Sequence, residues 1–148
     1  MLKPFVVFPE NRPDPLNIVG EGITIIASKN ETHGYELFIQ GGPEGSGPPP
    51  HSHHWDESFF VTKGNIEFGY DEEKMVAKPG TLVHLPAGTV HWFRFKKGGG
   101  QMISITSQTS NASSFFTDLA KEIPSGLPEI DKLQIVANRH GVKFHLDE

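Results

Sequence analysis

Short apolar runs, each bounded by glycine, proline or polar residues, follow one another along the first 110 positions of the chain. "GITIIA" at 22–27 and "YELFIQ" at 35–40 are typical of strands, because β-branched and aromatic residues predominate in them. Two further runs meet at 63–65 (KGN), which predicts a hairpin there. The remaining runs flank "PAG" at 86–88 and follow "GGG" at 98–100. Short strands at this spacing predict an all-β sandwich or barrel.

The pattern changes to a helical period after residue 110. In "NASSFFTDLAKEI" (111–123) and "PEIDKLQIVANRHG" (128–141), apolar residues recur at helical spacing, which predicts two amphipathic helices joined by a link at 124–127. We interpret the two apolar stripes as packing faces against the barrel. They comprise Phe115, Phe116, Leu119 and Ile123 in the first helix, and Ile130, Leu133, Val136 and Ala137 in the second.

The length of 148 residues suits a single domain, and an apolar fraction of 36% is adequate for one core. The 16 glycines and 12 prolines are too many for a helical bundle and fit a protein with many tight turns. We therefore expect one domain over residues 1–148, with a β-barrel at about 20–108 and a helical segment at about 110–141.

The charge pattern narrows the possible partners. Thirteen Lys and Arg against 18 Asp and Glu give a net charge of −5 without a basic cluster, which argues against nucleic-acid binding. No segment approaches the ~20 apolar residues of a membrane span, and the run "FVVF" at 5–8 is too short for a signal peptide. The absence of cysteine excludes disulfides and thiolate ligands, so any metal must bind nitrogen and oxygen. We expect a cytoplasmic protein.

Three of the eight histidines lie in "HSHHWDE" at 51–57. Strand side chains alternate, so His51 and His53 should lie on one face, about 7 Å apart along the strand. Glu57 has the same parity, while His54 should point away. Two imidazoles and a carboxylate provide three of the ligands that an octahedral transition metal takes.

A fourth candidate, His91, begins the run "HWFRF" directly after the turn "PAGTV". This turn could bring His91 back across the sheet to the first cluster. Phe93 and Phe95 share its parity and should point into the interior. An imidazole at the mouth of a barrel, above apolar residues, suits a recessed and partly dry metal site.

These residues resemble the two motifs of the cupin superfamily. The first motif, G-x5-H-x-H-x3,4-E-x6-G, is matched throughout by Gly45, His51, His53, Glu57 and Gly64. The second, G-x5-P-x-G-x2-H-x3-N, is matched by Gly80, Pro86, Gly88 and His91. The chain departs from the second motif at Phe95, which replaces the asparagine and leaves that part of the pocket apolar.

Over roughly residues 20–143 the chain resembles the small quercetin-dioxygenase-like single-cupin proteins. The resemblance implies a double-stranded β-helix (jelly-roll) barrel, often dimeric, with a divalent metal bound by His51, His53, Glu57 and His91. Nitrogen-rich sites accept Mn, Fe, Co, Ni, Cu or Zn, so the sequence does not identify the metal. The apolar run at 5–8 could extend a sheet or pair with another subunit, and we expect a homodimer.

Three histidines and one glutamate leave one or two coordination positions open, which is typical of a catalytic metal. We expect a dioxygenase that acts on a small aromatic or enolisable compound, with flavonols as the substrates implied by the resemblance. Glu57 would serve both as ligand and as proton acceptor. Two alternatives stay open: an isomerase, decarboxylase or hydrolase that uses the metal as a Lewis acid, and a non-enzymatic protein that binds a small ligand.

Blander interpretations of the same residues also stay open. The spacing could be accidental on a polar strand edge. We expect His54 at the surface or behind the ligands, while His84 could face either side of its strand. A bulge between His53 and Glu57 would break the alternation and change the direction of Trp55.

Overall fold

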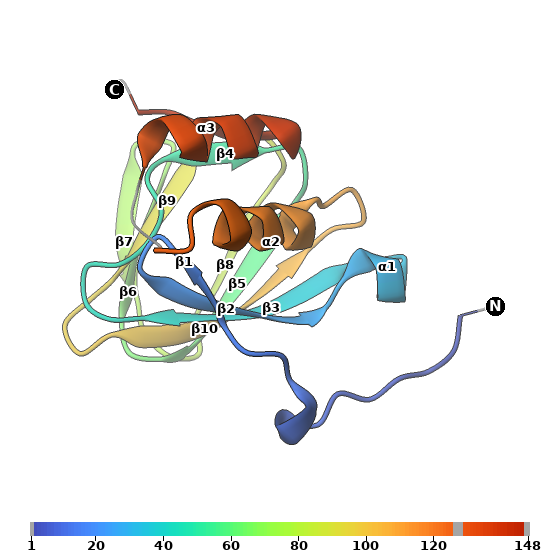
Figure 1. Cartoon of the computed structure of the whole chain (residues 1–148). Coiled ribbons are helices and arrows are strands. Elements are labelled where there is room, and N and C mark those ends of the chain that lie inside the picture. The colour runs from blue at the N-terminus through green and yellow to red at the C-terminus, as the bar shows by residue number, and fades with distance from the viewer. Residues whose placement is uncertain (1, 126–128, 147–148) are drawn as a thin grey trace.

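The computed structural model describes residues 2–125 and 129–146. Over these residues it contains two antiparallel sheets that face each other, with helices over one end (Figure 1). The six-stranded sheet has the order β1 (Leu16–Ile18), β2 (Glu21–Ala27), β3 (Glu36–Gly42), β10 (Gly100–Thr106), β5 (Glu57–Lys63) and β8 (Leu82–Leu85). The five-stranded sheet has the order β11 (Val142–Phe144), β4 (His51–His53), β9 (His91–Phe95), β6 (Ile66–Tyr70) and β7 (Glu73–Ala77). The predicted all-β jelly roll is confirmed.

The hairpin predicted at 63–65 is wrong, because the chain changes sheet there. β5 pairs with β8 and β10, whereas β6 pairs with β7 and β9. Gly64 has a φ of 69°, and a β-carbon at this position would lie 2.1 Å from the carbonyl oxygen of Gly99. This close approach of two backbones carries the chain across the corner between the sheets, where only glycine fits.

Alternate residues of β5, β6 and β9 fill the space between the sheets. Phe93 and Phe95 are 3% and 1% exposed, as expected from their parity with His91. The rings of Phe59, Phe68 and Phe93 contact one another with centroids 5.5 to 5.9 Å apart. Burial of each such ring stabilises the fold by roughly 1.5–3 kcal/mol, so this cluster forms a rigid floor beneath His91.

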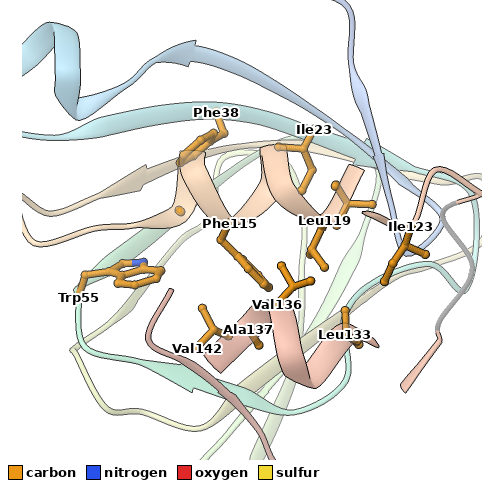
Figure 2. Packing of buried hydrophobic residues seen from close by; sticks show 12 residues of the cluster. Ile23, Phe38, Trp55, Phe115, Leu119, Ile123, Leu133, Val136, Ala137 and Val142 are labelled. Carbon is orange, nitrogen blue, oxygen red and sulfur yellow. The ribbon is translucent and has the colours of Figure 1, made fainter. Parts of the chain in front are cut away.

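Two C-terminal helices, α2 (Ala112–Glu122) and α3 (Ile130–Arg139), confirm the predicted helical segment and cover one end of the barrel (Figure 1). Figure 2 shows their apolar faces packed together with side chains of the sheets. Ile130 was expected on the buried face but is 44% exposed. Helical side chains lean toward the N-terminus, so at the first position of α3 this side chain extends beyond the packed region. In the link predicted at 124–127, residues 126 and 127 lie outside the described residues.

Five elements of the described residues were not predicted: a 3₁₀ helix at Pro9–Asn11, the short helix α1 (Lys29–Thr32), and the strands β1, β7 and β11. β11 pairs with β4 and places Phe144 opposite His51. The apolar run at 5–8 forms no strand; instead residues 2–8 extend away from the barrel as an exposed arm (Figure 1). Within the described ranges, no helix has the length and apolar character needed to cross a membrane.

Candidate metal centre

Three strands from both sheets bring the predicted histidines and glutamate to one end of the barrel. His51 and His53 lie on β4, and His51 pairs directly with His91 of β9. The chain then leaves this sheet, and Glu57 enters from the first residue of β5 in the opposite sheet. The strict alternation expected from His53 to Glu57 is therefore interrupted by a change of sheet, although the carboxylate still points inward. His54 is exposed, as expected.

The three histidines converge on a common point. One ring nitrogen of each lies within 4.8 Å of the others. The ring centroids of His51 and His91 are 4.2 Å apart, and those of His53 and His91 are 5.2 Å apart. His53 and His91 are buried, at 8% and 1% exposure. This spacing allows a single ion to contact all three rings.

Each ring is oriented by a backbone carbonyl two residues away. Nδ1 lies 2.9 Å from the Pro49 oxygen in His51, 3.0 Å from the Trp55 oxygen in His53, and 2.9 Å from the Thr89 oxygen in His91. A carbonyl oxygen only accepts hydrogen bonds, so Nδ1 must carry the proton in all three rings. In the neutral rings the lone pair is therefore on Nε2, the atom available to a metal.

Glu57 lies against this group but outside it. Its Oε1 is 3.1 Å from Nε2 of His53 and 3.7 Å from Nε2 of His91. Its Oε2 accepts a 2.6 Å hydrogen bond from the hydroxyl of Ser104. Burial by itself raises the pKa of the carboxyl, but contact with His53 and His91 outweighs it and holds this pKa well below its usual value. Glu57 is therefore ionised beside the histidines.

The free polar atoms of this cluster fit a divalent metal. Nε2 of His91 is buried and has no hydrogen-bond partner among the described residues. Nε2 of His53 faces a carboxylate oxygen, an arrangement that requires either a proton or a cation between the two atoms. Burial, and then repulsion by His91 and His53, lowers the pKa of His51, so this ring is neutral at neutral pH, as a metal ligand must be.

A largely apolar pocket is lined by His51 and His53 and, in part, by side chains of α2 and α3. Its cavity volume is about 50 Å³. Trp55 stacks on the ring of His53 with centroids 4.3 Å apart. Trp55 and Phe115 of α2 both line the pocket, and Phe115 lies near the centre of the cluster drawn in Figure 2. Two buried polar residues, Glu21 and Gln40, also line the pocket. No local pattern points to these two residues or to Ser104, because each reaches the site through pairing of distant strands.

The other histidine left open, His84, is on the outside of the barrel. It is exposed on β8 and its Nδ1 lies 2.8 Å from the hydroxyl of Ser58 on the neighbouring strand. Phe95 is buried in the barrel floor against Phe93, with ring centroids 5.7 Å apart. Phe95, at which the chain departs from the second motif, is thus part of the hydrophobic core.

Comparison with known proteins agrees with this geometry. The family model described as the cupin domain matches residues 38–105, the segment that holds all four predicted site residues. The chain therefore matches the cupin domain over this segment and shares the jelly-roll fold of solved cupins. Cupins typically bind a divalent metal, and the three histidines of this chain could hold one.

Individual relatives are distant. The chain is 28% identical over 83 residues to quercetin 2,3-dioxygenase of Bacillus subtilis (strain 168), which covers 55% of this chain and 25% of that enzyme. KdgF from Halomonas sp. has a TM-score of 0.67 at 19% identity, covering 75% of this chain and 99% of KdgF. A predicted oxalate decarboxylase from Thermotoga maritima has a TM-score of 0.61 at 17% identity, covering 70% and 98%. The two structures show the shared fold.

Proposed function

We propose that this cupin is a metal-dependent dioxygenase that acts on a small aromatic or enolisable compound. The observation that carries the proposal is the convergence of three Nε2 lone pairs, beside an ionised carboxylate, under an apolar pocket. The partial likeness to quercetin 2,3-dioxygenase supports oxygen chemistry over other cupin reactions.

Each residue then has a defined role. His51, His53 and His91 would hold the divalent metal through Nε2, and Glu57 would be the fourth ligand. Such a metal would supply Lewis-acid and oxygen-activating chemistry. Oε1 of Glu57 accepts the proton that a hydroxyl or enolisable carbon of the substrate loses, while Ser104 holds Oε2 in place.

The pocket restricts the substrate. A cavity of about 50 Å³ holds a few water molecules, whereas sites for drug-sized ligands measure roughly 300–1,000 Å³. A flavonol would enter only if α2 and α3 moved away from the barrel end. The cavity as it stands favours a compound of a few heavy atoms, whose apolar part would contact Trp55, Phe59 and Phe93.

The same small cavity favours a second candidate, an isomerase or decarboxylase in which the metal acts only as a Lewis acid. An apolar pocket limits water near the site and strengthens the interaction between a metal and an anionic oxygen. A protein that binds a small ligand without turning it over would use the same contacts.

Oxygen consumption separates these functions. Metal-free protein would be reconstituted separately with Mn, Fe, Co, Ni, Cu and Zn, and given pentane-2,4-dione or a flavonol. A dioxygenase consumes oxygen in step with substrate loss. The Glu57→Gln variant should retain part of its metal but lose turnover by about 10²–10⁴-fold, whereas the exposed Glu73→Gln variant should keep both its metal and its turnover. Substrate conversion without oxygen uptake would establish the second candidate, and tight binding without conversion would establish a binding protein.

We also propose a homodimer. The arm at 2–8 exposes Leu2, Phe5, Val6 and Phe8. The outer face of the first sheet carries a row of apolar residues that are in register across four strands: Ile39, Ile103, Phe60 and Leu82. A second copy could cover both surfaces. Sedimentation of the wild type and of Phe60→Ser/Leu82→Ser tests this, with a shift from dimer to monomer expected; a monomeric wild type would contradict it. A single domain and a cytoplasmic location stay predictions.

A further inference from the structure

Glu21, the first residue of β2, has a buried carboxyl group that the proposed mechanism does not use. The residue is 4% exposed, and its Oε1 has no hydrogen-bond partner within the described part of the chain. The same residue lines the pocket that contains His51, His53 and Glu57. A buried polar atom without a partner destabilises the fold, so this position calls for an explanation beyond packing.

Glu36 on the adjacent strand shows what a structural buried glutamate looks like here. It is 0% exposed, and both its oxygens are occupied. Oε1 accepts hydrogen bonds from the Ser110 hydroxyl (2.8 Å) and the Ser113 amide (3.0 Å), and Oε2 accepts one from the Lys29 amide (3.0 Å). The fold can therefore satisfy a buried carboxylate in this sheet, and at Glu21 it leaves Oε1 without a partner.

The surroundings of Glu21 favour its neutral form. Burial raises its pKa well above the usual value, and the negative charge of Glu57 raises it further, while Arg94 partly opposes the change. A neutral carboxyl group carries one O–H donor, which Glu57, as an ionised carboxylate, does not. The pocket therefore contains an acceptor and a donor in addition to the histidines. Two carboxyl groups with opposite pKa shifts in one pocket are typical of divided acid and base roles.

We propose that Glu21 is a second anchoring group for the substrate: it donates a hydrogen bond to an oxygen of the molecule whose other oxygen lies at the histidine centre. This inference rests on the proposed function only in using the same pocket. The cavity of about 50 Å³ is lined by Glu21 and also by His51 and His53. A ligand that fills it therefore lies near both Glu21 and these two histidines. The substrate class is a small compound with two oxygen atoms on a short carbon chain, such as an enolised dicarbonyl.

Paired ligands and paired variants test the contact. The probes are pentane-2,4-dione and pentan-2-one, which lacks the second oxygen, titrated calorimetrically into protein loaded with redox-inert Zn²⁺. The preference for the dione over the ketone should fall by about tenfold in Glu21→Leu, the loss expected for one buried hydrogen bond, and should persist in Glu21→Gln, whose amide still donates. Exposed Glu73→Gln is the control. An unchanged preference in Glu21→Leu would show that the metal alone selects the dione and would overturn the inference.

Two further readouts separate this inference from the proposed function. Infrared spectra of metal-free protein at neutral pH should show a protonated carboxyl band that Glu21→Gln lacks; the same band in both proteins would contradict the inference. Glu21→Leu should unfold at a temperature no lower than the wild type, because it removes an unsatisfied buried group, and a large decrease would assign Glu21 a structural role instead. If oxygen uptake fails while the Glu21-dependent preference remains, the dioxygenase falls and the anchoring contact stands. If oxygen is consumed but the preference for the dione does not depend on Glu21, the dioxygenase proposal stands and the anchoring contact falls.

Discussion

Glu36 and Glu57 lie on the two strands that flank β10, and both are opposite Thr106. Both are buried, at 0% and 5% exposure, yet their surroundings differ. Glu36 is surrounded by hydroxyl and amide donors from the beginnings of α1 and α2, and it fixes those helices to the sheet. Glu57 has one such donor, Ser104, and its other oxygen faces two imidazoles. The same residue type in the same row of one sheet is therefore surrounded by donors in one place and leaves an oxygen facing two imidazoles in the other.

The difference lies in which polar atoms remain free. A buried polar group that has all its partners stabilises one conformation, whereas free atoms that converge on one point are available to a ligand. By this criterion the Glu36 region is complete in itself, whereas the region of Glu57, His53 and His91 has polar atoms that a cation could bind. The following experiments act on one region and leave the other as the control.

The largest effect is expected from removing a histidine. Structural Zn²⁺ sites bind with about 10–16 kcal/mol, so one of four ligands contributes about 3–4 kcal/mol, or several hundredfold in affinity. His91→Ala should lose this much affinity for Zn²⁺, measured by competition with a chelator, while its barrel stays folded by circular dichroism. His84→Ala, on the outer face of β8, should bind as the wild type does. Equal affinity in both variants would contradict the assignment of His91.

Removal of the Glu36 carboxylate should affect stability instead. Glu36→Leu leaves several donors without an acceptor and should lower the free energy of unfolding by about 3 kcal/mol. Urea denaturation of metal-free protein measures this. Glu57→Leu should change the same quantity less, since it leaves fewer donors without an acceptor than Glu36→Leu does. If the two variants were equally destabilised, the contrast between the two regions would be wrong.

Loss of the Ser104 hydroxyl should weaken metal binding moderately. Groups that hold a ligand in place contribute about 10–100-fold to metal affinity, and Ser104→Ala removes the hydrogen bond to Oε2 of Glu57. Ser58→Ala, on the outer face of β5, is the matched control. An undiminished Zn²⁺ affinity in Ser104→Ala would place Glu57 outside the coordination sphere.

The smallest expected effect is on the pH dependence of metal-free protein. The pKa of His51 is lower in the fold than in the unfolded chain, so the unfolded chain binds the proton first as the pH falls. Stability should therefore decrease below about pH 6.5, by at most about 1.4 kcal/mol per pH unit for this group. His51→Gln should show a shallower decrease than exposed His33→Gln. Equal pH dependence of stability in the two variants would show that the fold does not lower the pKa of His51.

The sequence predicted the parts of this molecule that depend on local spacing. His51 and His53 are two residues apart on one strand, and the helical stripes of α2 and α3 are set by their own period. Pairing between distant strands cannot be predicted from local spacing. The residues around Gly64 predict a hairpin, because the local pattern contains no sign of the close contact between Gly64 and Gly99. The local pattern does not point to Glu21 or Ser104 for the same reason, since only the order of strands in the sheet brings Glu21 to the pocket and Ser104 to Glu57.

The central claim is that one cation lies among three imidazoles from β4 and β9. Anomalous diffraction at the absorption edge of the metal, from crystals of protein purified without added metal and then loaded with Zn²⁺ or Mn²⁺, locates the ion directly. The account predicts one strong peak within coordination distance of Nε2 of His51, His53 and His91. A peak elsewhere on the chain, or none, would contradict it.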